Sequence, residues 1–151
     1  MTRTAQPPDT PSRLSPRADQ AAAITAATRQ LRPRHSRALI TSACGTGKTL
    51  TGIRIAESLG ACLILNVFPP LDLLAQTALA WRADQRDEPM VALSSMDADA
   101  HDALRTSNIG GTNDAQGLAR ALSVLPRLTV FTTYASLDKV EATQHQGVPA
   151  R

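Results

Sequence analysis

Eight consecutive residues constrain the fold of this chain more than any other part of it: Ser42 to Thr49, with the sequence Ser-Ala-Cys-Gly-Thr-Gly-Lys-Thr. They follow a short apolar run, Ala38 to Thr41, and they precede a segment of helical character from Lys48 to Leu59. A glycine-rich loop that ends in Gly-Lys-Thr is typical of the turn between a buried parallel strand and the next helix. The pattern therefore predicts an α/β unit in which this loop follows the first strand.

The loop has the chemistry of a phosphate site. Its glycines allow the backbone to approach an anion and to turn its N–H groups inward, and a helix that begins near Lys48 adds the positive end of its dipole. The ammonium of Lys48 suits the β and γ phosphates of a nucleotide, and the hydroxyl of Thr49 can ligate Mg²⁺. We therefore expect this loop to bind ATP and Mg²⁺, rather than to be a simple turn with a surface lysine. The residues concerned are Ser42, Ala43, Cys44, Gly45, Thr46, Gly47, Lys48 and Thr49.

Helix-like and strand-like segments alternate along the rest of the chain. Residues 1–15 contain three prolines and predict a disordered arm, whereas residues 16–151 predict one domain. Such alternation is typical of a mainly parallel sheet with helices on its faces. The predicted elements are a helix from Ser15-Pro16 to Leu31, strands at 38–41, 61–68, 90–93 and 128–132, helices at 48–59 and 71–81, a loop at 94–111, a helix capped by Thr112, and a last helix from Ser136.

The composition is that of a globular protein with an aliphatic core, since hydrophobic residues make up 42% of the chain and aromatic residues only 3%. The net charge of +3 is unevenly distributed. Six arginines and one acid, Asp19, lie between Arg13 and Arg37. A basic block of this kind either meets a polyanion or is a solvated terminal arm.

The number of cysteines and the length of the apolar runs indicate where in the cell the protein is expected. Cys44 and Cys62 are too few for a disulfide scaffold, so we expect reduced thiols. The longest apolar run, Ala61 to Leu65, is far shorter than the roughly 20 residues of a membrane span. These features predict a cytoplasmic protein with no membrane partner.

The run Ser42 to Leu50 resembles motif I of the superfamily 2 helicases, the DEAD/DEAH-box group that includes the translocase subunits of restriction enzymes. The strict loop pattern has glycine where Ser42 stands, and these helicases tolerate another small residue there. Three further segments resemble family motifs in the family's order. Residues 16–20 resemble the segment whose glutamine contacts adenine, residues 70–77 resemble motif Ia, and residues 132–137 resemble the motif of the same lobe that contacts a single strand.

The resemblance implies a three-layer P-loop fold of the RecA type, with a parallel sheet, flanking helices and only part of the helicase lobe present. It implies that Gln20 contacts the adenine of ATP. It also implies a nucleic-acid partner, DNA in the restriction-enzyme members, and contacts to it from Pro70, Gln76, Thr133 and Tyr134. Other interpretations of these residues are an exposed helix glutamine at 20, a solvated helix face at 76, and strand-end or core packing at 133 and 134.

No acidic pair follows an apolar strand in this sequence, although hydrolysis in such enzymes needs an aspartate on Mg²⁺ and a glutamate that orients water. Asp87-Glu88 lacks the preceding strand, and Asp97, Asp99 and Asp102 fall in the predicted loop. Residues 146–151 resemble the approach to the family's acidic strand, and the second helicase lobe is absent.

We therefore assign no catalytic residue and expect this chain to bind ATP without hydrolysing it. Without the acidic strand beside it, the strand at 38–41 is expected to have an exposed edge. Two alternatives stay open. One is a module that binds nucleotide or nucleic acid without catalysis, and the other is a different P-loop enzyme such as a small kinase.

Overall fold

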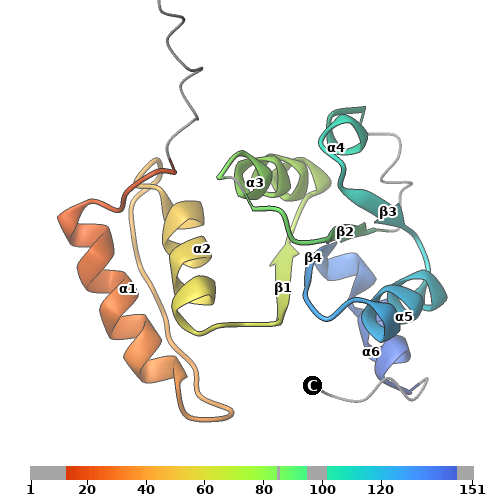
Figure 1. The fold of residues 1–151 in the computed structure, drawn as a ribbon, viewed down its shortest axis with the longest axis horizontal. Coiled ribbons are helices and arrows are strands. Elements are labelled where there is room, and N and C mark those ends of the chain that lie inside the picture. Colours follow the sequence, from red (N-terminus) through yellow and green to blue (C-terminus); the bar gives the residue numbers. More distant parts are fainter. Residues whose placement is uncertain (1–12, 85, 95–101, 146–151) are drawn as a thin grey trace, which may run out of the picture.

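The computed structural model describes residues 13–84, 86–94 and 102–145. Helices and strands alternate through this part of the chain (Figure 1). The helices are α1 (Ala18–Leu31), α2 (Lys48–Ser58), α3 (Leu71–Ala83), α4 (Asp102–Thr106), α5 (Ala115–Val124) and α6 (Leu137–His145). The strands are β1 (Leu63–Phe68), β2 (Met90–Leu93), β3 (Gly110–Thr112) and β4 (Leu128–Thr133), and a 3-10 turn, η2 (Tyr134–Ser136), follows β4. Among the described residues, no helix is long and apolar enough to cross a membrane.

The four strands form one parallel sheet in the order β1-β4-β2-β3. Strand β4 pairs with both β1 and β2, and all six of its residues are buried. The registers align Phe68 with Thr133 and Leu93 with Thr132, so the carboxyl ends of these strands meet at one edge of the sheet. The α/β fold with a parallel sheet, predicted from the sequence, is therefore confirmed.

Helices cover the two faces of the sheet. On one face α3 contributes Leu74, Ala78 and Trp81 to a core that also contains Phe131 of β4. The rings of Trp81 and Phe131 meet edge to face, with centroids 5.8 Å apart. On the other face Leu118 of α5 packs against β2 and β4, with Val140 of α6 beside it. Figure 1 shows α3 and the α5–α6 pair on opposite sides of the sheet.

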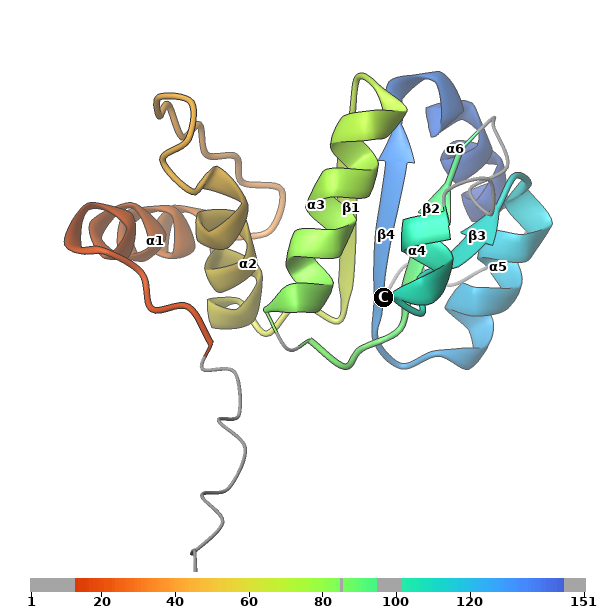
Figure 2. The ribbon, with the colours of Figure 1, turned by 90° about the horizontal axis from the view of Figure 1, so that it is seen from above.

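The first two helices form a separate layer beside α3. Ile24 and Ala27 of α1 pack against Ile55 of α2, whereas Ile53, on another side of α2, joins the core under α3. Helix α1 therefore contacts the rest of the molecule mainly through α2, and it lies at the far end of the molecule from α5 (Figure 2). The glycine-rich loop connects into this α1–α2 layer at the start of α2.

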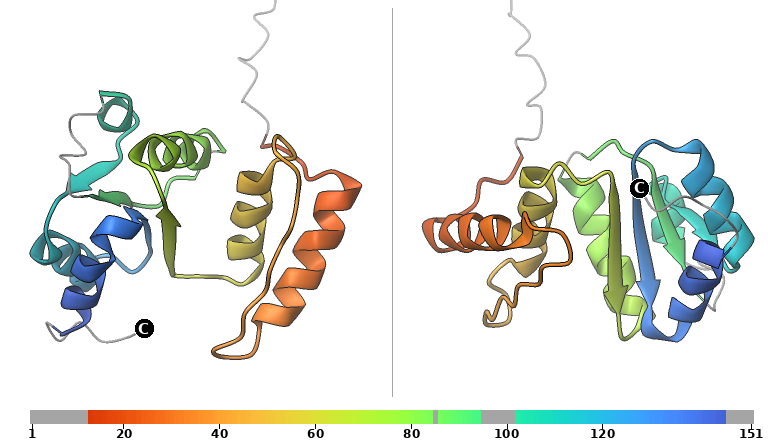
Figure 3. Two further views of the ribbon diagram at one scale, coloured as in Figure 1. Left: turned by 180° about the vertical axis from the view of Figure 1, so that it is seen from behind. Right: turned by 90° about the horizontal axis from the view of Figure 1, so that it is seen from below.

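The strand predicted at residues 38–41 is wrong. Residues 36–43 form no ladder with any described strand, and Leu39 and Ile40 are 92% and 38% exposed. This segment runs irregularly beside α1 and α2 (Figure 3). A parallel strand is stable only when neighbouring strands pair with it and helices cover it. Here β1 pairs with β4 on one side, and no described strand lies between β1 and residues 38–41.

Three local predictions also need correction. Helix α1 begins at Ala18 rather than at Ser15-Pro16. The predicted loop at 94–111 contains α4 and the first two residues of β3. Thr112 ends β3, and the cap of α5 is Asp114, whose carboxylate accepts a hydrogen bond of 2.6 Å from the backbone N–H of Gly117. Most of the predicted arm at 1–15 lies outside the described residues, and its residues 13 and 14 contact α2 through Arg54 and Glu57.

A buried carboxylate joins α2 to the end of α3. The side chain of Asp84 is 3% exposed and accepts two hydrogen bonds from Arg54, at 2.5 and 2.8 Å, and one from Arg13, at 3.0 Å. Burial disfavours the charged form of this carboxyl, but the hydrogen bonds from the two arginines outweigh burial and lower the pKa of Asp84. The ionised form is therefore stabilised by folding.

We expect Asp84→Asn to lower the free energy of unfolding at pH 7 by about 3 kcal/mol, because it removes one partner of a buried ion pair. The contribution is fully present above the ordinary aspartate pKa of about 3.9 and is lost as the pH falls through the lowered pKa of the folded state. Urea titrations from pH 7 to pH 3 should show the two proteins converging in stability.

Asp102→Asn is the matched control, since the Asp102–Arg105 pair is exposed and exposed pairs contribute at most about 1 kcal/mol. Equal losses in the two variants at pH 7 would contradict the role assigned to Asp84.

Candidate functional site

The loop from residue 42 to residue 49 has the backbone of an anion site. Gly45 and Gly47 have φ angles of +75° and +79°, which glycine adopts at no steric cost. Gly47 is the N-cap of α2, and no side chain caps the first turn of that helix. The first turn also contains no acidic residue. The positive end of the α2 dipole is therefore presented by bare backbone N–H groups, which favour a bound anion.

The ammonium of Lys48 lies against its own loop. It donates to the carbonyl oxygens of Ser42 at 3.1 Å and of Ala43 at 2.7 Å. The hydroxyl of Thr46 donates to the same Ala43 carbonyl at 2.8 Å and contacts the hydroxyl of Ser42. These contacts hold the loop closed around the lysine, whose side chain is exposed to solvent and can exchange a carbonyl for a phosphate oxygen.

Thr49 and Cys44 complete the predicted set. Thr49 is half-buried in the first turn of α2, next to Lys48, and Cys44 is an exposed free thiol at the tip of the loop. A hydroxyl at the start of this helix is the kind of ligand that Mg²⁺ accepts beside a triphosphate. Within the described part of the chain, no group of three or more His, Cys, Asp or Glu side chains could hold a metal on its own.

The structure brings Gln20 to this loop. Its side chain is almost fully buried, its amide nitrogen donates to the carbonyl of Thr46 at 2.8 Å, and its amide oxygen accepts from the backbone N–H of Arg17 at 2.9 Å. The guanidinium of Arg17 donates to the same Thr46 carbonyl at 3.1 Å. Arg17 was not predicted as a site residue, although its place three residues before Gln20, at the N-cap of α1, was the available signal.

The four residues predicted to contact nucleic acid belong to three elements, α3, β4 and η2, that end or begin at the carboxyl edge of the sheet. Pro70 is the N-cap of α3, and Gln76 is exposed on that helix. Thr133 is the buried last residue of β4, and its hydroxyl donates to the hydroxyl of Ser136. Tyr134 is 60% exposed in the turn that follows. Because β1 and β4 are parallel and in register to their ends, the start of α3 and Tyr134 lie at the same edge.

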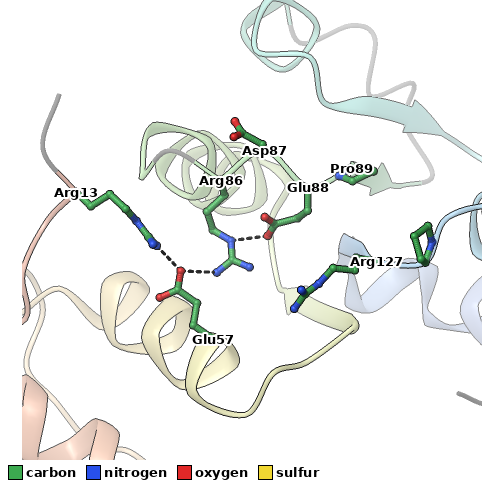
Figure 4. Close-up of a pocket in the computed structure, with 8 residues that line it drawn as sticks. Arg13, Glu57, Arg86, Asp87, Glu88, Pro89 and Arg127 are labelled. Carbon is green, nitrogen blue, oxygen red and sulfur yellow. Dashed lines mark hydrogen bonds and ion pairs between the residues drawn. The ribbon is translucent and has the colours of Figure 1, made fainter. Parts of the chain in front are cut away.

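The carboxylates considered for catalysis do not gather at the loop. Asp87 and Glu88 line a pocket of about 590 Å³ with Pro89 and Arg127, the residues immediately before β2 and β4 (Figure 4). This pocket is therefore at the amino edge of the sheet, opposite the edge that holds Tyr134. Asp102 lies in α4 and pairs with Arg105 at 2.5 Å. Asp97 and Asp99 lie outside the described residues.

Four of the charged residues that line this pocket are paired with one another. Glu57 contacts Arg13 and accepts from Arg86 at 3.1 Å, and Glu88 also pairs with Arg86. The Arg86 guanidinium lies 5.0 Å from the centre of the Trp81 ring. These contacts consolidate the ends of α2 and α3, and the pocket has no glycine-rich backbone or helix N-terminus to offer a phosphate.

This chain matches a known protein family and resembles solved structures of larger enzymes. The family described as "Type III restriction enzyme, res subunit" matches residues 13–147. One similar solved structure is the ATP-dependent Type ISP restriction-modification enzyme LlaBIII bound to DNA, with a TM-score of 0.75 and 24% identity, covering 91% of this chain. Another is a nuclease-deletion mutant of the Type ISP enzyme LlaGI in complex with a DNA substrate mimic, with a TM-score of 0.74 and 27% identity, covering 90% of this chain.

This chain spans only 10% and 14% of the lengths of those two chains. No curated protein matches it.

The loop geometry predicts that two glycines respond differently to substitution. A Cβ at Gly45 would meet no atom within 4 Å, whereas a Cβ at Gly47 would lie 2.5 Å from the amide nitrogen of Gln20. Gly45→Ala should cost about 1–2 kcal/mol of stability through its positive φ alone. Gly47→Ala should cost about 1 kcal/mol more, because Gln20 must move and lose a hydrogen bond.

Urea unfolding of both variants, alone and combined with Gln20→Ala, measures this difference. The extra cost at Gly47 should vanish when Gln20 is absent. An extra cost that persists in the Gln20→Ala background would show that the close approach to Gln20 is not its source.

Proposed function

Because this chain belongs to the family of type III restriction enzyme res subunits, we propose that its glycine-rich loop binds the triphosphate of ATP together with Mg²⁺. The observation that carries the proposal is the bare N-terminus of α2, preceded by two glycines of positive φ and followed at once by Lys48. A backbone of this shape, a helix dipole and one exposed cation together favour a polyphosphate over a singly charged anion.

Each residue of the loop has a defined part in this proposal. The N–H groups from Gly45 to Thr49 would bind the phosphate oxygens, and the hydroxyl of Thr49 would be a ligand of Mg²⁺, which in turn neutralises charge on the phosphates. Lys48 would exchange its two loop carbonyls, those of Ser42 and Ala43, for phosphate oxygens. Such an exchange replaces neutral hydrogen bonds with charge-assisted ones, which are roughly twice as strong.

For this chain we propose binding without turnover. Phosphoryl transfer in such enzymes needs carboxylates at the metal and at the attacking water. Of the described candidates, Asp87 and Glu88 line the pocket at the amino edge of the sheet, and Asp102 is in α4. One solved enzyme that resembles this chain is described as ATP-dependent, and both solved enzymes were captured with DNA or a DNA mimic. The whole protein would accordingly be an ATP-dependent DNA translocase, and this chain would be the N-terminal portion of its ATP-binding lobe.

We further propose that DNA lies along the carboxyl edge of the sheet. Two features support this: the exposed ring of Tyr134 and the N-terminus of α3 at Pro70, which no side chain caps although Asp72 lies in its first turn. An exposed aromatic ring can stack on a base, and helix N-terminal N–H groups can bind a backbone phosphate. The hydroxyl of Thr133 is engaged by Ser136, so Thr133 would contribute through its backbone.

We expect the chain to bind ATP·Mg²⁺ weakly and Lys48→Ala to abolish this binding, since a charge-assisted hydrogen bond of about 1.5–3 kcal/mol is lost. Isothermal titration calorimetry at matched protein concentration measures this. The sequence contains a second lysine, Lys139, which lies on α6 and donates to the carbonyl of Asn113. Lys139→Ala is therefore the matched control and should bind as wild type. Equal affinity for ATP in the Lys48 variant and wild type would overturn the assignment of the loop.

We expect Tyr134→Ala to weaken binding of a single-stranded oligonucleotide by about tenfold, since one base–aromatic stack contributes about 1–3 kcal/mol. Tyr134→Phe keeps the ring and should bind almost as tightly as wild type. Fluorescence anisotropy with a labelled oligonucleotide distinguishes the variants. A Phe variant as weak as the Ala variant would show that the hydroxyl, not stacking, is responsible, and an Ala variant as tight as wild type would remove Tyr134 from the interface.

A further inference from the structure

We infer that Gln20 is a positioning residue for the phosphate loop: it fixes the peptide unit between Thr46 and Gly47 and so aims the Gly47 N–H at the phosphate. The inference rests on the proposed binding of a triphosphate by this loop. It differs from the role implied by the helicase resemblance, in which the same glutamine contacts the adenine base. The juxtaposition that carries it is a buried side-chain amide held between the start of α1 and the loop.

Both ends of the Gln20 amide are used by the chain itself. The amide nitrogen donates to the Thr46 carbonyl at 2.8 Å, and the amide oxygen accepts from the N–H of Arg17 at 2.9 Å. The residue is 5% exposed, so its side chain presents almost no surface to a ligand. A glutamine that reads a base must offer a donor and an acceptor at once, and here the oxygen and one donor are already engaged.

The Thr46 carbonyl is the key atom because a trans peptide unit is planar. Its C=O and the following N–H, that of Gly47, point in opposite directions. A donor that holds the carbonyl toward α1 therefore turns the Gly47 N–H away from α1. Two donors converge on this oxygen, the amide of Gln20 and the guanidinium of Arg17 at 3.1 Å, and together they fix the orientation of the peptide plane.

The backbone conformation of Gly47 and its lack of a side chain both suit the contact with Gln20. Its φ of +79° gives the chain its turn into α2, and a Cβ there would lie 2.5 Å from the Gln20 amide nitrogen. The absence of a side chain at 47 thus leaves room for the glutamine as well as permitting the turn. Gly45 has a similar φ and open space around it, so the close fit is specific to the residue that Gln20 faces.

Positioning and base reading make different predictions about ligands. A residue that aims a loop N–H affects every polyphosphate equally, whether or not a base is attached. A residue that contacts adenine affects ATP and leaves GTP and inorganic tripolyphosphate unchanged. The ratio of affinities among these three ligands therefore separates the two roles.

The test uses two variants of Gln20 in the full chain. Gln20→Met is neutral and of similar length, and it removes both hydrogen bonds. Gln20→Glu keeps an acceptor for the Arg17 N–H but places a carboxylate oxygen against the Thr46 carbonyl. Gln30 is an exposed glutamine on the same helix, so Gln30→Met and Gln30→Glu are matched controls.

We expect Gln20→Met to weaken binding of ATP, GTP and tripolyphosphate, each with Mg²⁺, by a common factor of about ten. Calorimetry that shows a loss for ATP alone would assign Gln20 to the base and overturn the inference. Unchanged affinity for all three ligands would overturn it equally.

A measurement without ligand decides the inference even if wild type binds none of the three, an outcome that would refute the proposed function alone. In ¹⁵N relaxation experiments we expect the order parameter of the Gly47 amide to fall from about 0.85 to below about 0.6 in both Gln20 variants. The Gln30 variants should match wild type. In both Gln20 variants the amides of α3 and β4 should stay as ordered as in wild type, a local effect that a purely structural role would not produce. A rigid Gly47 amide in both Gln20 variants would contradict the inference.

Discussion

The parallel pairing of β4 with β1 on one side and β2 on the other is the interaction on which the rest of this structure depends. All six residues of β4 are buried, and helices pack on both faces of the sheet that it centres. Because the three strands share one direction, their carboxyl ends, the start of α3 and Tyr134 fall at one edge. The paired charges of Glu57, Arg86 and Glu88 fall at the opposite edge. The two edges thus have different chemistry, and among the described residues the N-terminus of α3, which no side chain caps, lies at the carboxyl edge.

Contacts between helices, rather than pairing in the sheet, hold the phosphate loop in place. Helix α2 packs on α1 through Ile55 and on the main core through Ile53, and the ion pair of Arg54 with Asp84 ties it to the end of α3. Gln20 of α1 then holds the loop itself at Thr46. The loop therefore keeps its turn into α2 although the segment before it is not in a strand.

Much of this arrangement followed from local sequence. The Gly-Lys-Thr pattern and the apolar periods predicted α2, α3, β1, β2 and β4 closely, because each element has its own alternation or helical stripe. The strand predicted at residues 38–41 was wrong because an apolar run becomes a strand only if another strand pairs with it. Strand β3 was missed because its sequence is Gly-Gly-Thr, which has turn-like propensity and depends on pairing with β2. The contact between Gln20 and Thr46 spans 26 residues, so no local pattern contained it.

Amide chemical-shift mapping of the ¹⁵N-labelled chain with ATP·Mg²⁺ tests the central claim most directly, because it shows where on the molecule the nucleotide binds. We expect the largest shifts on Gly45, Gly47, Lys48 and Thr49, with a smaller response at Gln20. Shifts centred instead on Arg13, Arg86 and Arg127 would place the anion in the pocket at the opposite edge of the sheet. That result would contradict the assignment of the glycine-rich loop as the nucleotide site.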